Sequence, residues 1–161
     1  MESIIDTMGG KERLFIYIFF TIHVFGFGAA GFLLSYGEED LSSTFAMGGF
    51  AIFVYLVFYF VIFGWEDIKR MFINALIGIF GIYAWMGDIL SLFDKNIDNF
   101  SRQYHIVPGV FFVIYTFLLR HALIDLSQSL FSKKYGKEYG EKIGNGFFIG
   151  LGIASSLIAL L

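Results

Sequence analysis

The stretch MFINALIGIFGIYAWMGDILSLF, residues 71–93, decides the fold class that we predict for this chain. Apolar and aromatic side chains fill almost all of it. As an α-helix it is long enough to cross a hydrocarbon core about 30 Å thick, which needs about 20 residues. Asp88 is the only acidic residue in the stretch. The stretch therefore predicts a membrane-spanning helix that carries an ionisable group.

Four further segments have the same apolar character. In hydrocarbon the backbone has no water to bind, so a spanning segment is a helix or a barrel strand, and these segments lack the alternation of barrel strands. The chain is 57% hydrophobic and only 16% charged, whereas soluble domains are about a quarter charged. We predict an all-α polytopic membrane protein, a compact bundle of about five transmembrane helices that forms a single domain over residues 1–161. The predicted helices are 14–35, 45–65, 71–93, 104–126 and 143–161.

The composition also excludes several classes of function. The chain has no cysteine, which excludes disulfides, thiolate metal sites and thiol catalysis. Its net charge of −3 provides no general basic field for nucleic acid. The links between the predicted helices are too short for a separate catalytic module, and neither S-x-x-K nor H-E-x-x-H occurs. We therefore expect no catalytic residue and no metal site, and an enzyme is the less favoured reading.

Basic residues gather in alternate links, which predicts the orientation in the membrane. Lys and Arg are enriched on the cytoplasmic side of membrane proteins. They occur near the N-terminus, in the second link and in the fourth, and we therefore place the N-terminus inside and the C-terminus outside a cell membrane of the bacterial or archaeal inner-membrane type. The fourth link, 133–142, is also a candidate for binding anionic lipids, although the same charges simply follow the positive-inside rule. The basic residues of these three regions are Lys11, Arg13, Lys69, Arg70, Lys133, Lys134, Lys137 and Lys142.

Small and polar residues of the 71–93 helix share one face. Asn74, Gly78, Gly81, Trp85 and Asp88 recur at steps of four, three, four and three residues, which is the repeat of a helix face. Membrane helices pack through small residues and interhelical hydrogen bonds. We therefore expect this stripe to face protein and Asp88 to be turned away from lipid.

Other glycines predict further packing faces. Gly26 lies on one stripe with His23 in the first predicted helix, and Gly146 and Gly150 form a small-xxx-small pair in the fifth. Such faces bring membrane helices into close contact, so we expect a homo-oligomer or a subunit of a larger membrane complex. The fifth helix is short and rich in glycine, so a re-entrant hairpin or a helix docked in an oligomer interface also fits it.

Four ionisable residues inside the predicted helices are the candidate functional residues. They are Asp88, His23, His121 and Asp125. Charged groups cost about 2.5 kcal/mol or more near the bilayer centre and are often functional there. His121 and Asp125 lie one helical turn apart on one face. The four residues form a candidate transport or proton path from one leaflet to the other.

Structural explanations of the same residues remain open. Asp88 is also expected to pair with Arg102 or His105, which lie at about its depth. A structural interpretation fits His23 as well as a transport role does: a neutral imidazole that is hydrogen bonded across helices. Arg120 beside His121 would then belong to an interfacial cluster whose long side chains reach the headgroups.

Three functions follow from these patterns. The first is an oligomeric ion or proton pathway between helices, of the channel or transporter type. The second is a non-catalytic accessory or assembly subunit of a larger membrane complex. The third is a small redox protein that holds haem b between His23 and His121, whereas no cofactor is expected under the first two.

Overall fold

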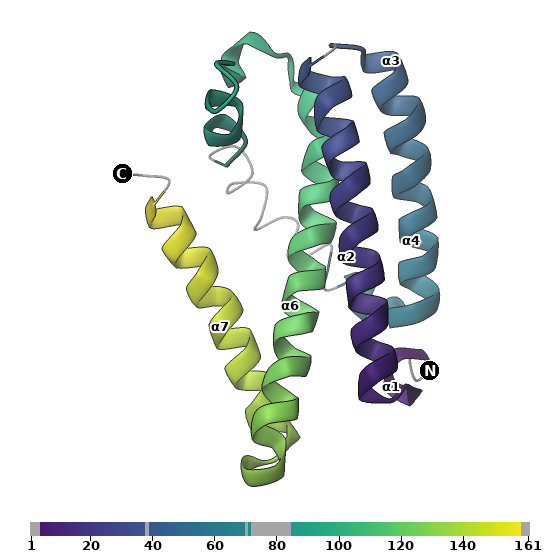
Figure 1. The fold of residues 1–161 in the computed structure, drawn as a ribbon, viewed down its shortest axis with the longest axis vertical. Coiled ribbons are helices and arrows are strands. Elements are labelled where there is room, and N and C mark those ends of the chain that lie inside the picture. Colours follow the sequence, from purple (N-terminus) through teal and green to yellow (C-terminus); the bar gives the residue numbers. More distant parts are fainter. Residues whose placement is uncertain (1–3, 38, 70, 72–84, 159–161) are drawn as a thin grey trace. The chain divides into compact units, whose positions relative to one another are not determined.

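The structure, a computed structural model, describes residues 4–37, 39–69, 71 and 85–158. Within these residues the regular structure is helical and no strand occurs, so the predicted all-α class is confirmed (Figure 1). Asn74, Gly78 and Gly81, which belong to the predicted stripe of the 71–93 helix, lie outside the described residues.

The labelled elements follow one another with short connections. Residues 65–69, 71 and 85–91 are helical as well. Two short π-helical segments, η1 and η2, continue α2 and precede α4, while η3 and η4 are 3₁₀ turns. In chain order the elements are α1 (Ile4–Thr7), α2 (Gly10–Phe32), η1 (Leu33–Gly37), α3 (Leu41–Ser43), η2 (Thr44–Gly48), α4 (Gly49–Phe63), η3 (Ile97–Asn99), η4 (Arg102–His105), α6 (Ile106–Tyr135) and α7 (Lys137–Ile158).

Three helices are long and apolar enough to cross a membrane. They cover Gly10–Gly37, Leu41–Phe63 and Arg102–Phe131. Each extends beyond the apolar core from which its span was predicted, because a helix continues through polar residues wherever its backbone bonds are satisfied. At the start of α2, for example, Glu12 Oε2 accepts a hydrogen bond from the backbone N–H of Gly9 at 2.9 Å, and this places the charged residues before 14 inside the helix. The fifth predicted helix likewise begins earlier, at Lys137.

The chain divides into two compact units, Met1–Tyr115 and Thr116–Leu161. Unit 1 contains α2, α4 and the start of α6, and unit 2 contains the rest of α6 and α7. Each unit is described by itself, and the single domain over residues 1–161 stays a prediction.

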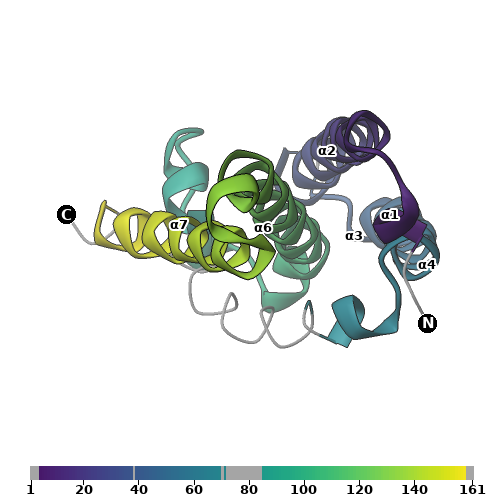
Figure 2. The ribbon, with the colours of Figure 1, turned by 90° about the horizontal axis from the view of Figure 1, so that it is seen from below.

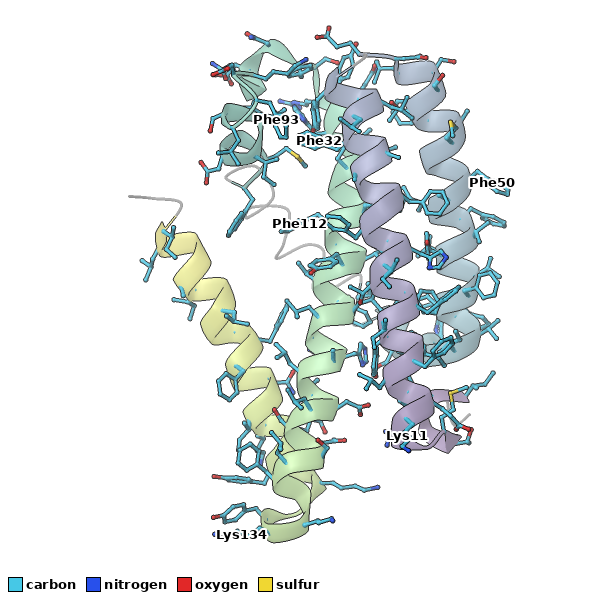
Figure 3. All side chains as sticks on the ribbon, viewed as in Figure 1. Lys11, Phe32, Phe50, Phe93, Phe112 and Lys134 are labelled. Atoms are coloured by element: carbon cyan, nitrogen blue, oxygen red, sulfur yellow. The ribbon has the colours of Figure 1, made fainter. Side chains whose placement is uncertain are left out.

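Aromatic side chains hold α2 and α4 together in unit 1. The ring of Phe20 lies 6.2 Å from Tyr59 and 6.4 Å from Phe63, and Tyr17 lies 6.1 Å from Phe63. The short α1 lies against the end of α4 that contains Phe63 (Figure 2). The opposite side of α4 is exposed and apolar, and Phe50 points away from α2 (Figure 3). An exposed apolar face of this kind suits contact with lipid.

Glycines of α2 and η2 receive side chains from the start of α6. A Cβ atom at Gly31 would lie 3.2 Å from Val107 Cγ1, and one at Gly48 would overlap the same methyl group. At Gly28 a Cβ would touch Phe111 at 3.4 Å. Gly26, which we expected to make this contact, would meet nothing within 4 Å. The packing face of α2 is therefore the neighbouring stripe, because the large side chains of α6 insert where α2 has Gly28 and Gly31.

Unit 2 is a helical hairpin closed by a different glycine pair. Gly136, with φ +89°, makes the turn between α6 and α7, a backbone conformation that glycine adopts without strain. A Cβ atom at Gly140 would lie 2.7 Å from Gln128 Cα, and one at Gly144 would lie 2.6 Å from Ile124 Cα. These two glycines have the G-x-x-x-G spacing of close helix pairs.

The predicted packing pair of α7 is open in this chain. A Cβ atom at Gly146 or Gly150 would meet nothing within 4 Å. Both glycines line a shallow apolar hollow on α7, together with Ile143, Phe147 and Leu151. Since one face of α7 is occupied by Gly140 and Gly144 against α6, the later pair lies on another side of the helix.

Candidate functional site

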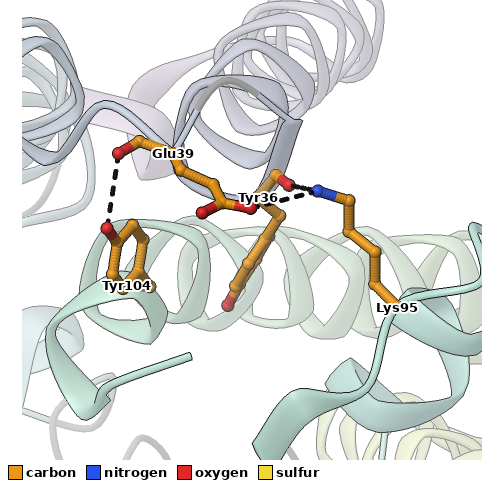
Figure 4. A network of polar contacts seen from close by, with 4 residues as sticks. All are labelled: Tyr36, Glu39, Lys95 and Tyr104. Atoms are coloured by element: carbon orange, nitrogen blue, oxygen red, sulfur yellow. Dashed lines mark hydrogen bonds and ion pairs between the residues drawn. The ribbon is translucent and has the colours of Figure 1, made fainter. Parts of the chain in front are cut away.

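One end of unit 1 carries a group of polar residues that we call the polar cap. It consists of Tyr36, Glu39, Lys95, Tyr104 and His105, which come from three separate parts of the chain. Figure 4 shows the first four of them. Its scaffold is an apolar cluster that packs the 85–91 helix against the end of α2 and η1. The buried members of that cluster are Tyr36, Met86 and Leu90, and the partly buried ones are Phe32, Ile97, Phe100 and Tyr104.

Tyr36 is the centre of the polar cap. Its side chain is 1% exposed, and its ring lies 4.8 Å from Phe32 and 5.1 Å from Phe100. The hydroxyl oxygen lies 2.7 Å from Nδ1 of His105, a residue 69 positions further along the chain. Because the ring is fixed on both sides, the position of the hydroxyl group is fixed as well.

Lys95 joins two links of the chain at this end. Its ammonium group donates to the carbonyl oxygen of Tyr36 and lies 3.6 Å from Glu39 Oε1 (Figure 4). Tyr104 Oη donates to the carbonyl oxygen of Glu39 at 3.3 Å. Lys95 thus satisfies a carbonyl group at the C-terminal end of the α2–η1 helix, where a positive charge is also favoured by the helix dipole.

Two residues at the same end of unit 1 have an unusual backbone conformation. Glu39 and Asp94 have φ values of 57° and 56°, a left-handed conformation that costs about 1–2 kcal/mol for residues with a side chain. Ser35 in η1 is fully buried, and its hydroxyl group has no hydrogen-bond partner among the described residues. Short π-helical segments such as η1 and η2 are frequent at functional sites, and strained residues gather there. The polar cap is therefore a candidate functional site.

Asp88 is exposed, contrary to the expectation that it is turned away from the surroundings. In the 85–91 helix, Met86 and Leu90 face the apolar cluster. Asp88 lies two positions from each of them, which is about 200° around the helix. The larger apolar residues, and not the predicted stripe, therefore determine which face of this helix packs. Trp85 is half-buried.

The expected partners of Asp88 are engaged elsewhere or exposed. His105 is hydrogen bonded to Tyr36, and Arg102 is exposed at the start of η4. No ion pair of Asp88 occurs among the residues that the structure describes. Whether Asp88 belongs to a transport path stays a prediction.

His23 is bound within its own helix. Its Nδ1 atom lies 2.7 Å from the carbonyl oxygen of Phe19, and the two rings are 4.0 Å apart. Because a carbonyl oxygen only accepts hydrogen bonds, Nδ1 carries the proton and Nε2 is the accepting nitrogen of the neutral ring. This intrahelical bond occupies Nδ1, and the hydrogen bond across helices that the sequence suggested stays a prediction.

A second group of polar residues lies in unit 2, and we call it the hairpin cluster. It consists of Arg120, His121 and Asp125 of α6 and Asn145 of α7, all half-buried. Arg120 Nε donates to Asn145 Oδ1 at 3.0 Å, and Asn145 Nδ2 donates to the carbonyl oxygen of Glu141 at 3.1 Å. Asn145 directly follows Gly144, so the close approach of α7 to α6 brings its amide within reach of Arg120.

The segment 133–142, which we predicted as a link, is helical on both sides of Gly136, and some of its charged side chains make local contacts. Lys142 lies 2.8 Å from Glu138, and this hydrogen bond lowers the pKa of Glu138 and raises that of Lys142. Lys134 lies 5.0 Å above the ring of Tyr135. Lys133 and Lys137 are exposed. The predicted contact with anionic lipids stays a prediction.

A short acidic turn lies beside the polar cap. Asp40 caps the N-terminus of α3, and its carboxylate accepts from the backbone N–H of Ser43 at 3.1 Å. Hydrogen bonds from the side chain and backbone of Ser43 hold the pKa of Asp40 below its ordinary value of 3.8. This turn fixes the direction in which the chain leaves the link that carries Glu39.

Metal and haem sites have no further support from the fold. Within the described part of the chain, no group of three or more His, Asp or Glu residues could hold a metal ion. His23 and His121 belong to different units, so a haem between them stays a prediction. Comparison with protein-family models, with curated proteins and with solved structures finds no match to this chain.

Proposed function

We propose that this chain is an integral membrane protein that carries protons or small ions across a cell membrane, working as an oligomer. The observation that carries the proposal is the hairpin cluster inside the candidate span Arg102–Phe131. An ionised side chain near the bilayer centre costs about 2.5–3.5 kcal/mol on insertion scales, so such residues mostly mark ion or proton paths. Here three ionisable residues, Arg120, His121 and Asp125, occur within six consecutive positions of α6, and Arg120 is hydrogen bonded to Asn145 of α7.

The depth and chemistry of the hairpin cluster fit proton transfer. At 1.5 Å per residue, Arg120 lies about 21 Å from the start of α6, within a hydrocarbon core about 30 Å thick. Imidazole and carboxylate groups are the side chains that most often accept and release protons in proteins. His121 and Asp125 are four residues apart, so their side chains share one face of α6.

The polar cap supports the predicted threading. Phe63 lies beside Tyr17 near the start of α2, whereas Glu39 and Lys95 pair beyond the other end of α2. Phe63 and Lys95 therefore lie towards opposite ends of α2. This supports a further crossing by the predicted 71–93 helix. The orientation with the N-terminus inside rests on the distribution of Lys and Arg alone.

Proton flux into liposomes tests the proposal. Purified protein is reconstituted with a pH-sensitive dye inside the vesicles, and Asp125→Asn is compared with Asp98→Asn, which removes an exposed carboxylate of η3. We expect Asp125→Asn to reduce flux at least about tenfold, the loss typical of a missing acid–base group. Asp98→Asn should leave flux unchanged. Wild-type vesicles that pass neither protons nor alkali ions, or an Asp125→Asn protein with full flux, would contradict the proposal.

An accessory subunit is the second candidate function. It is favoured by the open hollow beside Gly146 and Gly150 and by the exposed apolar residues along α7, which include Phe147, Ile149, Leu151, Ile153, Leu157 and Ile158. Stoichiometric co-purification with a different membrane chain in mild detergent would support this function. A stable homo-oligomer with no other chain would favour the transport function.

A further inference from the structure

We infer that Tyr36 and His105 are the proton-binding pair at the polar-cap end of the proposed pathway, in the role that the sequence assigned to Asp88. The inference rests on the proposed function and names two residues for it. Tyr36 had no place in the sequence-based path, and His105 was expected only as a structural partner of Asp88.

The geometry of the pair suits a proton-binding site. The 2.7 Å distance between Tyr36 Oη and His105 Nδ1 is that of a well-formed hydrogen bond. Tyr36 is buried and His105 is half-buried, so the pair connects the interior of unit 1 with its surface. The imidazole group gains and loses protons near neutral pH. Asp88, by contrast, is exposed on the side of its helix away from Met86 and Leu90.

Three charged side chains lie at the same end of unit 1 as the pair. Lys95 is bound to the carbonyl group of Tyr36 and pairs with Glu39, and Tyr104 donates to the backbone of Glu39. Arg102 lies three residues before His105 in η4. The two cations, Lys95 and Arg102, oppose a charged imidazole, while Glu39 favours one. Lys95 and Glu39 offset one another and Arg102 leaves one positive charge, so the neighbouring charges together oppose a charged imidazole.

Proton uptake reverses the direction of one hydrogen bond. In the neutral pair the Tyr36 hydroxyl donates to Nδ1, and Nε2 of His105 carries the ring proton. When Nδ1 gains a proton from water, its N–H donates to Tyr36 Oη, in place of the bond that the hydroxyl group donated. Release of the proton from Nε2 then leaves a neutral ring again, so one proton has entered and one has left. The tyrosine keeps its own hydrogen throughout.

Two measurements on four variants test the inference. Tyr36→Phe removes only the hydroxyl group, and His105→Gln removes the titrating ring. Tyr104→Phe is the matched control, because it deletes another tyrosine hydroxyl of the polar cap and leaves the pair intact. Asp88→Asn tests the sequence-based alternative. Each protein is checked for assembly by size-exclusion chromatography, and then its proton flux is measured against pH in liposomes.

The second measurement does not depend on flux. The chain has three histidines, so ¹⁵N-histidine spectra in detergent or nanodiscs are simple, and His105→Gln identifies the His105 signal. We expect Tyr36→Phe to shift the protonation midpoint of His105 by about 0.4–1 pH unit, the equivalent of one ordinary hydrogen bond. Tyr104→Phe should shift it by less than about 0.2 unit. In liposomes, His105→Gln should lower flux at least about tenfold, and Tyr36→Phe should displace the pH profile by the same amount as the His105 midpoint.

The outcomes separate the inference from the proposed function. If wild-type vesicles carry no protons, the proposed function fails, and an unshifted His105 midpoint in Tyr36→Phe would then also overturn the pair. If wild-type vesicles carry protons and Asp88→Asn stops flux while His105→Gln and Tyr36→Phe leave it unchanged, the inference is wrong and the sequence-based prediction is right. If Tyr36→Phe and Tyr104→Phe shift the His105 midpoint equally, the midpoint does not depend specifically on the Tyr36 hydroxyl group. That result would overturn the inference.

Discussion

Both units bring helices together at glycines, but their glycines receive different atoms. In unit 1, Gly31 and Gly48 receive the branched side chain of Val107 from α6. In unit 2, Gly140 and Gly144 approach backbone atoms of Gln128 and Ile124. A side chain can be trimmed or can shift, whereas a backbone atom moves only with its helix. The comparison teaches that the hairpin of unit 2 should tolerate less change at its glycines than the three-helix contact of unit 1.

The strongest test of this difference is Gly144→Ala. The new Cβ atom would lie 2.6 Å from Ile124 Cα, so α6 and α7 have to separate. We expect a loss of about 3 kcal/mol, the upper end of the cost of overpacking, in the free energy of unfolding in detergent. Gly146→Ala is the matched control, since its Cβ would meet nothing within 4 Å. Equal stability of the two variants would contradict the close contact between Gly144 of α7 and Ile124 of α6.

Gly48→Ala should cost less and should be recoverable. Its Cβ atom would overlap Val107 Cγ1, and we expect a loss of about 1–2 kcal/mol. Because the obstructing atom belongs to a side chain, adding Val107→Ala should relieve the overlap, and the double variant should lose less than the sum of the single ones. Gly49→Ala, which meets nothing within 4 Å, should have no comparable effect. Strict additivity would contradict the side-chain contact.

The polar bond of unit 2 should be worth less than its glycine contact. Asn145→Leu removes the acceptor of Arg120. Interhelical hydrogen bonds in membrane proteins average about 0.6 kcal/mol and reach about 1.7 kcal/mol. A double-mutant cycle with Arg120→Met should give a coupling energy in this range by unfolding in detergent. A coupling near zero would mean that the two side chains do not interact.

The smallest effect concerns the turn that leads from the polar cap into α3. Ser43→Ala removes a hydrogen bond that holds the pKa of Asp40 below 3.8, so this pKa should rise towards that value in an NMR titration. A carboxyl group with a lowered pKa in the folded state stabilises the fold above its unfolded pKa and loses that contribution as the pH falls through the folded value. Ser43→Ala should therefore lower the stability of the fold at pH above about 4, and its effect should disappear as the pH falls further. An unchanged pKa would contradict the hydrogen bond from the Ser43 side chain to Asp40.

The sequence is sufficient for the helical class and for three helices that are long and apolar enough to span. Long apolar runs determine both, whatever the tertiary contacts are. The face of the 85–91 helix was predicted wrongly, because the small and polar stripe was given more weight than Met86 and Leu90, which bury more apolar surface. Gly140 and Gly144 were missed for a related reason. Charged residues, Glu141 and Lys142, stand between them, so their spacing lies outside any apolar run.

The polar cap could not be predicted from local sequence patterns. Tyr36 and His105 are 69 positions apart, and nothing in the neighbourhood of either residue indicates the other. No sequence pattern predicts the two π-helical segments either, because an apolar helix has the same composition whether or not one of its turns is widened. Within the hairpin cluster, the spacing of His121 and Asp125 was visible, whereas the bond between Arg120 and Asn145 depends on how closely α7 approaches.

The length of α6 has a consequence for the surroundings of the protein. Its 30 residues make a rod about 45 Å long, half as long again as a hydrocarbon core of about 30 Å. Tilting alone would require about 48°, beyond the 0–40° that single membrane helices adopt. One end of α6 must therefore stand clear of the acyl chains, and a thicker or thinner bilayer would draw the turn at Gly136 towards the headgroups or push it away from them.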